Sequence, residues 1–383
     1  MTGQMNMRIS TSGALILAGS STICAVMGSI HAFSVFLDPL EIAFGLNRAT
    51  NSLTYSFALV ALTISVLLGP RFYGSVSAGM LFALAGLTGA AGAVVAGFSQ
   101  SIIGVWIGYS IGFGAANGLG YGFALQFVAR ANPSNAGLAM GIVTAAYAFG
   151  AVVSPAIFNL LLKTGGIEAA MMALAFALIL ASAIAVWLTN RAGVDYEAAE
   201  TQGTAEMPPT RVVARIWLAY GASVTAGLMV IGHAVGIAEL ANVTPWLAPS
   251  VLAACNLLGS LFGGRLIDRL SQRTVLTCLP LISMVGLALL VLFEPLTFLA
   301  LGLVGLAYGG TIAAYPAAIA GRFEKEVGPR VYGWVFTAWG TAGLLAPWFA
   351  GLLFDAYQSY GPAIWVAAAL ALLSSLMAAS QRE

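Results

Sequence analysis

Few side chains in this sequence could bind a charged molecule or exchange a proton, and the two histidines stand out among them. His31 and His233 are the only histidines, and both lie inside apolar segments. An imidazole titrates near neutral pH, with a reference pKa of about 6.5, so it can pair with a carboxylate once protonated. We expect both to be substrate ligands and proton-coupling residues, with Asp38, at i+7 from His31, as a third proton-coupling candidate. The alternative is that each imidazole only packs against a neighbouring helix.

A second group of candidates is polar or aromatic and recurs at helical spacing. Asn117 and Tyr121 lie four residues apart, as do Asn256 and Ser260, so each pair shares one helix face. Such side chains could hydrogen-bond a small polar molecule, or equally a neighbouring helix. Together with the histidines they predict a substrate site made of these residues: His31, Asn117, Tyr121, Tyr147, His233, Asn256, Ser260, Tyr308 and Trp339.

The elements that position these residues come in two copies. Segment 143–162 reappears as 335–354, at a spacing of 192 residues, and this pairs Tyr147 with Trp339. His31 and His233 also occupy equivalent places, near the start of each copy. Two copies of one membrane unit are typical of secondary transporters, whose substrate site lies between the halves.

Composition assigns the chain to a membrane. Sixty per cent of its residues are hydrophobic and 8% are charged, with a mean hydropathy of +0.93, whereas a soluble domain carries roughly 25% charged residues. The net charge of +1 gives no reason to expect a nucleic-acid partner. Three cysteines in apolar runs argue against a disulfide framework. No metal-ligand cluster, nucleophile motif or phosphate-binding loop is present, so we expect neither an enzyme nor a cofactor.

Apolar runs of about 20 residues are long enough to cross a bilayer. We predict an all-α membrane protein with twelve transmembrane helices in two pseudo-symmetric six-helix bundles, the N-terminal bundle over 1–189 and the C-terminal bundle over 213–383. The polar stretch 190–212 joins them as a cytoplasmic linker. The predicted spans are 13–37, 51–70, 77–98, 102–129, 136–162, 168–189, 213–237, 246–267, 274–293, 296–320, 331–355 and 361–379.

The basic residues predict the orientation. If both termini are cytoplasmic, 13 of the 15 Lys and Arg residues lie inside, and only Arg48 and Lys163 lie outside. We therefore expect a monomeric, multi-pass protein of a bacterial inner membrane. Glu239, Glu294 and Asp355 fall near outer helix ends, where we predict solvated rim charges.

Several motifs resemble the major facilitator superfamily over essentially the whole chain. GGRLIDR (263–269) matches the superfamily's loop signature, which implies a structural gating motif made of Gly264, Arg265, Asp268 and Arg269. The N-terminal counterpart, GPRFYGS (69–75), has Tyr73 at the position of the acid. The resemblance implies the two-bundle fold and transport by alternating access.

A closer resemblance is to the oxalate/formate antiporter and monocarboxylate transporter group. GSIHAFSVFLDPL (28–40), GLGYG (118–122) and YGGTIAAYPAAIAGRF (308–323) follow that group's helix patterns. The group holds its carboxylates with an Arg and a Lys, but the matching positions here are Ser260 and Trp339. A dianion would lack compensation in a low-dielectric cavity, so we expect a monoanion, a zwitterion or a neutral molecule rather than oxalate.

Three functions remain open from the sequence. The first is secondary transport of a small organic acid of the monocarboxylate kind, driven by a proton gradient. The second is efflux of a neutral or zwitterionic metabolite or drug. The third is a membrane sensor that does not transport.

Overall fold

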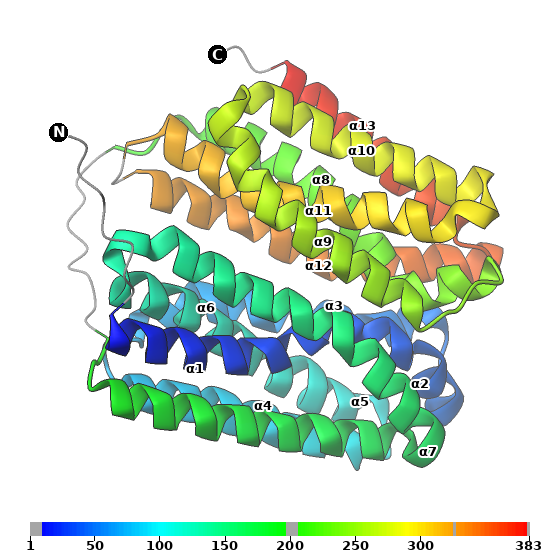
Figure 1. Ribbon diagram of the computed structural model, residues 1–383. Helices are drawn as coiled ribbons and strands as arrows, with labels where there is room; N and C mark the ends of the chain where they lie inside the picture. The colour runs from blue at the N-terminus through cyan, green and yellow to red at the C-terminus, as the bar shows by residue number, and fades with distance from the viewer. Residues whose placement is uncertain (1–9, 197–205, 325–326, 381–383) are drawn as a thin grey trace.

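A computed structural model describes residues 10–196, 206–324 and 327–380, and these residues form helices and short connections with no strand. Figure 1 shows two layers of roughly parallel helices, one containing the helices up to α7 and the other containing α8 to α13. The described helices are therefore arranged as two groups that follow the order of the chain.

The N-terminal layer is assembled around α7. The helix α1 packs against α7 and α6, while α4 packs against α7 and α3 against α6. Its elements are α1 (Thr11–Met27), the 3₁₀ segment η1 (Gly28–Phe36), α2 (Leu37–Phe44), α3 (Arg48–Leu68), η2 (Gly69–Arg71), α4 (Ala78–Gly97), α5 (Ile102–Val105), the π-helical η3 (Trp106–Phe113), α6 (Gly114–Ala131), η4 (Pro133–Asn135) and α7 (Ala136–Ala192).

The C-terminal layer pairs its helices in a similar way. The helix α11 packs against α9, α12 against α8, and α10 against both α11 and α13. Its elements are α8 (Thr210–Leu240), α9 (Leu247–Arg269), α10 (Gln272–Leu292), η5 (Glu294–Leu296), α11 (Thr297–Arg322), α12 (Gly328–Tyr357) and α13 (Gly361–Ala379).

Among the described residues, ten helices are long and apolar enough to cross a membrane. One of them, α7, covers two predicted spans and breaks at Gly166, whose φ of 68° and ψ of −163° only glycine adopts easily. The span predicted over 246–267 corresponds to α9, whose apolar part, Leu247–Gly263, is shorter. The chain is thus a multi-pass membrane protein, and twelve spans remain a prediction that this arrangement fits.

Glycines bring α1 and α7 into direct backbone contact. A Cβ on Gly28 would strike the carbonyl oxygen of Tyr147, and a Cβ on Gly150 would strike the carbonyl oxygen of Ala25. Close packing of this kind is how helices associate in lipid, where apolar surface alone gives no driving force. It also carries Tyr147 to the side of η1.

The four ends of the two layers meet at one end of the molecule, called the terminal end below. The Ser12 hydroxyl in α1 donates to the Ala192 carbonyl at the end of α7 (3.0 Å), and Arg215 in α8 donates to Ser380 after α13 (3.4 Å). The helix α2 lies at the opposite end, the α2 end (Figure 1). This common end agrees with the predicted placement of both termini on one side.

The two layers touch through pairs of helices that the sequence repeat makes equivalent. The helix α3 packs against α12, and α7 packs against α9. The helices α3 and α12 correspond to the second and eleventh predicted spans. The first part of α7 and α9 correspond to the fifth and eighth. A twofold relation exchanges these two pairs, so the contacts are those that the predicted pseudo-symmetry requires.

The orientation can be tested with single cysteines in a background whose native cysteines are replaced by alanine. We expect a membrane-impermeant maleimide applied to intact cells to label Thr244→Cys, at the α2 end, and to leave Thr210→Cys, at the terminal end, unlabelled until the membrane is opened. Labelling of Thr210→Cys in sealed cells would reverse the predicted topology.

Candidate functional site

The first candidate residue, His31, lies where the first long helix is interrupted. Residues Gly28–Phe36 form a 3₁₀ segment between α1 and α2, nine residues long, whereas such segments seldom exceed three or four residues. The Nδ1 atom of His31 forms a hydrogen bond of 2.7 Å with the Tyr55 hydroxyl. The His31 ring also contacts the ring of Tyr147 edge-on, with the ring centroids 5.7 Å apart. The side chain is only partly buried.

Three further candidates from α6 and α7 gather beside His31. The Tyr147 hydroxyl donates to Oδ1 of Asn117 (3.1 Å), and the ring of Tyr147 lies 4.6 Å from that of Tyr121. Asn117 is fully buried and donates through Nδ2 to the Met27 carbonyl (2.6 Å), just before η1. The structure therefore brings His31, Asn117, Tyr121 and Tyr147 together, and we call them the N-terminal cluster.

The C-terminal half brings four candidates together in the same manner. The Trp339 indole donates to the Tyr308 hydroxyl (2.8 Å), and Ser260 donates to Oδ1 of Asn256 (3.4 Å) and to the Gly309 carbonyl (3.2 Å). Because Gly309 is the neighbour of Tyr308, these contacts connect α9, α11 and α12. Asn256, Ser260, Tyr308 and Trp339 form the C-terminal cluster.

The C-terminal cluster lies on elements that reach the boundary between the layers, since α12, which carries Trp339, packs against α3. The phenol of Tyr308 is close enough to interact electrostatically with those of Tyr55, Tyr121 and Tyr147. These residues come from α3, α6, α7 and α11, so both halves contribute to one aromatic and amide-rich region. Asn117, Tyr147, Tyr308 and Trp339 are each at most 9% exposed, so these side chains are packed inside the protein.

His233, the sequence equivalent of His31, has a different environment. It also marks a helix break, since its φ of −126° and ψ of 16° interrupt α8. It is fully buried, its Nε2 lies 2.8 Å from the Pro347 carbonyl and 3.4 Å from the Ser52 hydroxyl, and its Nδ1 lies 3.2 Å from the Tyr360 hydroxyl. Both ring nitrogens are therefore engaged, away from the two clusters and at the contact of α8, α12 and α3.

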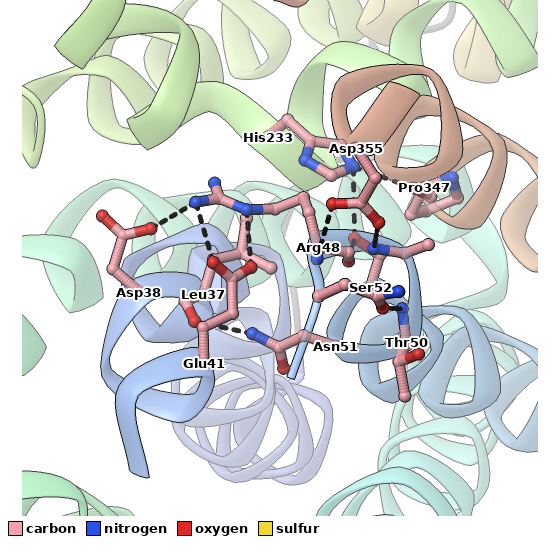
Figure 2. A network of polar contacts seen from close by, with 12 residues as sticks. Leu37, Asp38, Glu41, Arg48, Thr50, Asn51, Ser52, His233, Pro347 and Asp355 are labelled. Carbon is pink, nitrogen blue, oxygen red and sulfur yellow. Dashed lines mark hydrogen bonds and ion pairs between the residues drawn. The ribbon is translucent and has the colours of Figure 1, made fainter. Parts of the chain in front are cut away.

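The same contact continues to a buried arginine at the α2 end. Arg48, only 7% exposed, forms ion pairs with Asp38 (2.5 Å) and Glu41 (2.6 Å) of α2 and donates through Nη1 to the Tyr360 hydroxyl (2.8 Å). Figure 2 shows the guanidinium between these carboxylates, with His233 and Asp355 beside it. Glu239, at the end of α8, interacts with Asp38 from the other half. Asp38 thus pairs with Arg48, in a separate environment from His31.

The other half caps the helix that Arg48 begins. The Asp355 carboxylate, near the end of α12, accepts hydrogen bonds from the backbone N–H groups of Arg48 (3.0 Å) and Ala49 (2.8 Å). A carboxylate at a helix N-terminus satisfies donors that lack partners within the helix and favours the helix dipole. The prediction of a solvated rim charge misses this role, because the two partners lie more than 300 residues apart in the chain.

The gating motif lies at the terminal end of α9. The chain passes through Gly264, Arg265, Asp268 and Arg269 in that helix, but only the side chain of Arg269 is among those described, and it is exposed. Its role remains a prediction.

In the N-terminal counterpart, Tyr73 replaces the acid and is fully buried against Phe123 and Tyr196. Asp195 accepts a hydrogen bond from the backbone N–H of Ala78 (2.6 Å), and Arg130 lies over the Tyr196 ring at 4.4 Å. The start of the predicted linker therefore supplies a carboxylate that caps α4.

Sequence reasoning missed Arg48, Tyr360 and Asp355 as partners. One signal was present, because Arg48 is one of only two basic residues on the predicted outer side. A basic residue retained against the positive-inside bias suggests a specific counter-charge.

Comparison with known proteins gives the family resemblance. The model of the Major Facilitator Superfamily matches residues 212–381. The "Uncharacterized MFS-type transporter YhjX" of Escherichia coli (strain K12) is 27% identical over 86% of this chain and 85% of that protein. The "Oxalate:formate antiporter" of Oxalobacter formigenes is 22% identical over 84% of this chain and 80% of that protein.

Solved structures give the fold. A bacterial homologue of the human lysosomal transporter Spinster, in an inward-facing and unoccupied conformation, has a TM-score of 0.75 at 14% identity and covers 97% of this chain and 96% of that one. The POT family transporter PepTSo has a TM-score of 0.72 at 13% identity, covering 96% and 97%. The chain has the major facilitator fold, and it resembles the transporters of that superfamily that include the oxalate:formate antiporter.

The Asp355 cap can be tested by measuring how far the halves separate at the α2 end. Charge-assisted hydrogen bonds contribute about 1.5–3 kcal/mol each, so Asp355→Ala should raise the open fraction at this end at least about tenfold. Spin labels on Ile42→Cys and Thr244→Cys would report it as a shift of the distance distribution to longer values. Glu294→Ala, which removes an exposed carboxylate from the same end, is the matched control. An unchanged distribution in Asp355→Ala would show that the cap does not hold the halves together.

Proposed function

We propose that this chain, which resembles major facilitator transporters along its length, carries a small organic acid with a single carboxylate across the membrane, together with a proton. The observation that supports this most directly is the state of His31. Its Nδ1 has a partner in Tyr55, while Nε2 has no hydrogen-bond partner among the described residues and the side chain is only partly buried. A protonated Nε2–H is the donor that a carboxylate would need.

The surroundings of His31 favour one negative charge over two. The N-terminal and C-terminal clusters contribute phenols, amides, a hydroxyl and an indole, and neither contains a lysine or an arginine. The buried cation of this half, Arg48, is already paired with two carboxylates. A second carboxylate would lose its hydration on entering the site without gaining a positive partner, at a cost of several kcal/mol.

A proton provides the compensating charge for the first carboxylate. A neutral imidazole that gains a proton binds an anion, and loss of the proton on the other side of the membrane releases it. The cargo then moves as proton plus anion. Asp38 and His233 remain proton-coupling candidates, but both have close partners at the α2 end, whereas His31 lies beside the aromatic clusters.

The conformation fits a carrier that alternates between two openings. Ser52 with His233, and the Asp355 cap on α3, join the halves at the α2 end. We propose that this is the outer side and that the described state is closed there. The Spinster homologue with the same fold is itself described as inward-facing.

The second candidate function is efflux of a neutral or zwitterionic metabolite. It is favoured by the aromatic walls, since Tyr121, Tyr147, Tyr308 and Trp339 could enclose an apolar molecule without any charge pairing. The two functions differ in their dependence on pH.

We expect uptake of radiolabelled formate, acetate or lactate into proteoliposomes to rise as the outer pH falls, because protonation of His31 creates the anion partner. His31→Gln keeps a hydrogen-bond donor but cannot titrate, so it should remove this pH dependence. His233→Gln is the matched control and should alter the rate while preserving the pH dependence. An unchanged pH profile in His31→Gln would exclude proton coupling through this residue.

Trp339 stands where the related antiporters place a lysine, so Trp339→Lys should shift the preference from monocarboxylates towards dicarboxylates. We expect oxalate or malonate to compete at least about tenfold better against a labelled monocarboxylate, since one added charge–carboxylate contact contributes about 1.5–3 kcal/mol. Trp339→Phe, which removes the bond to Tyr308 without adding charge, should show no such shift. If both variants behave alike, Trp339 does not border the carboxylate site.

A further inference from the structure

A groove at the terminal end of the C-terminal half has the features of a binding site and lies outside the two clusters. It has a volume of about 790 Å³ and lies among the first turns of α8 and the last turns of α11 and α13. Three arginines line it: Arg211, Arg215 and Arg322. No acidic residue is among the described residues that line it.

The position of Arg211 is unfavourable unless an anion is near. Arg211 lies in the first turn of α8, where the helix dipole is positive and a basic residue is disfavoured, and Arg215 follows it four residues later on the same helix face. The first turn of α8 contains no acidic residue, and no side chain caps it. The two guanidinium groups therefore add positive charge near the positive end of the helix dipole, on the residues that line the groove.

The walls of the groove are apolar below this charged rim. Ile216, Leu218 and Met377 line it together with the arginines, and Leu218 is 52% exposed on the outer surface of the helix. Arg215 also contacts the Ser380 hydroxyl (3.4 Å), which places a polar group next to the guanidinium. A polar, basic rim above apolar walls at a membrane surface matches a molecule with an anionic head and an apolar chain.

We propose that this groove binds an anionic phospholipid, with its phosphate held by Arg211 and Arg215 and the upper part of an acyl chain lying along Leu218 and Met377. Basic pockets between transmembrane helices on the cytoplasmic side are where anionic lipid headgroups bind. The bound lipid joins the ends of α8, α11 and α13. This proposal requires that the chain lies in a membrane with the terminal end on the cytoplasmic side, and it is independent of the cargo.

The test uses the purified full-length chain in a neutral detergent, titrated separately with phosphatidylglycerol, phosphatidylcholine and inorganic phosphate. We expect phosphatidylglycerol to raise the Tm saturably, by about 2–4 °C, and phosphatidylcholine and phosphate to have little effect. Native mass spectrometry should show one phosphatidylglycerol retained per chain. An equal rise with phosphatidylcholine would overturn the proposal, and so would an equal, saturable rise with phosphate alone.

Two variants assign the effect to the groove. Arg211→Gln combined with Arg215→Gln should weaken phosphatidylglycerol binding about fivefold for each removed charge. Arg273→Gln removes an exposed arginine from the first turn of α10 at the same end, outside the groove, and should bind as the wild type does. Equal binding by the double variant and the wild type would place the lipid elsewhere. The lipid measurement is independent of the proposed transport. A change in monocarboxylate transport in His31→Gln would neither support nor contradict lipid binding in the groove.

Discussion

The buried guanidinium of Arg48 is the interaction on which the observed arrangement of the two halves depends. A charge with 7% exposure would be very costly without compensation, and here two carboxylates of α2 and the phenol of Tyr360 supply it. Because Arg48 also begins α3, its side chain fixes α2 against α3 while its backbone N–H is held by Asp355 of the other half. Arg48 therefore holds α2 against α3 within its own half and also contacts the C-terminal half through Asp355.

The two breaks, one in the first helix of each half, show how equivalent positions of a repeated sequence acquire different surroundings. His31 and His233 occupy equivalent places, and both interrupt a long helix. A break releases backbone groups that must find other partners, which is why irregular backbone in a membrane occurs where it is buried in protein or lines a cavity. At the ends of η1, the Met27 and Leu37 carbonyls accept hydrogen bonds from the side-chain amides of Asn117 and Asn51. The two rings differ in their contacts: that of His233 joins α3 to α12, whereas that of His31 contacts aromatic side chains, and its Nε2 has no hydrogen-bond partner among the described residues.

Local patterns made much of the fold and part of the site predictable from the sequence. Pairs four residues apart, such as Asn256 and Ser260, do share a helix face and contact each other. The aromatic groups around His31 and Trp339 also gather as the repeat suggests, although their role in binding stays a prediction. What escaped prediction depends on partners distant in sequence, since nothing near Asp355 indicates that it caps α3. The 3₁₀ form of η1 escaped as well, because its composition suits an α-helix equally.

The placement of charge also bears on how readily the α2 end can open. Asp38, Glu41 and Arg48 all belong to the N-terminal half, so both ion pairs can move together as one body. Opening breaks contacts that cross between the halves, among them the Asp355 cap, the bond from Arg48 to Tyr360 and the contact of Ser52 with His233. The interaction of Glu239 with Asp38 and the packing of Arg48 over Phe354 also cross there. Each broken hydrogen bond exposes groups that water can hydrogen-bond, so the net cost per bond is about 0.5–3 kcal/mol rather than that of separating buried ions. Under the proposed alternating access, this arrangement would keep the buried charges compensated in both states and keep the energy difference between the states small enough for substrate binding to change their populations.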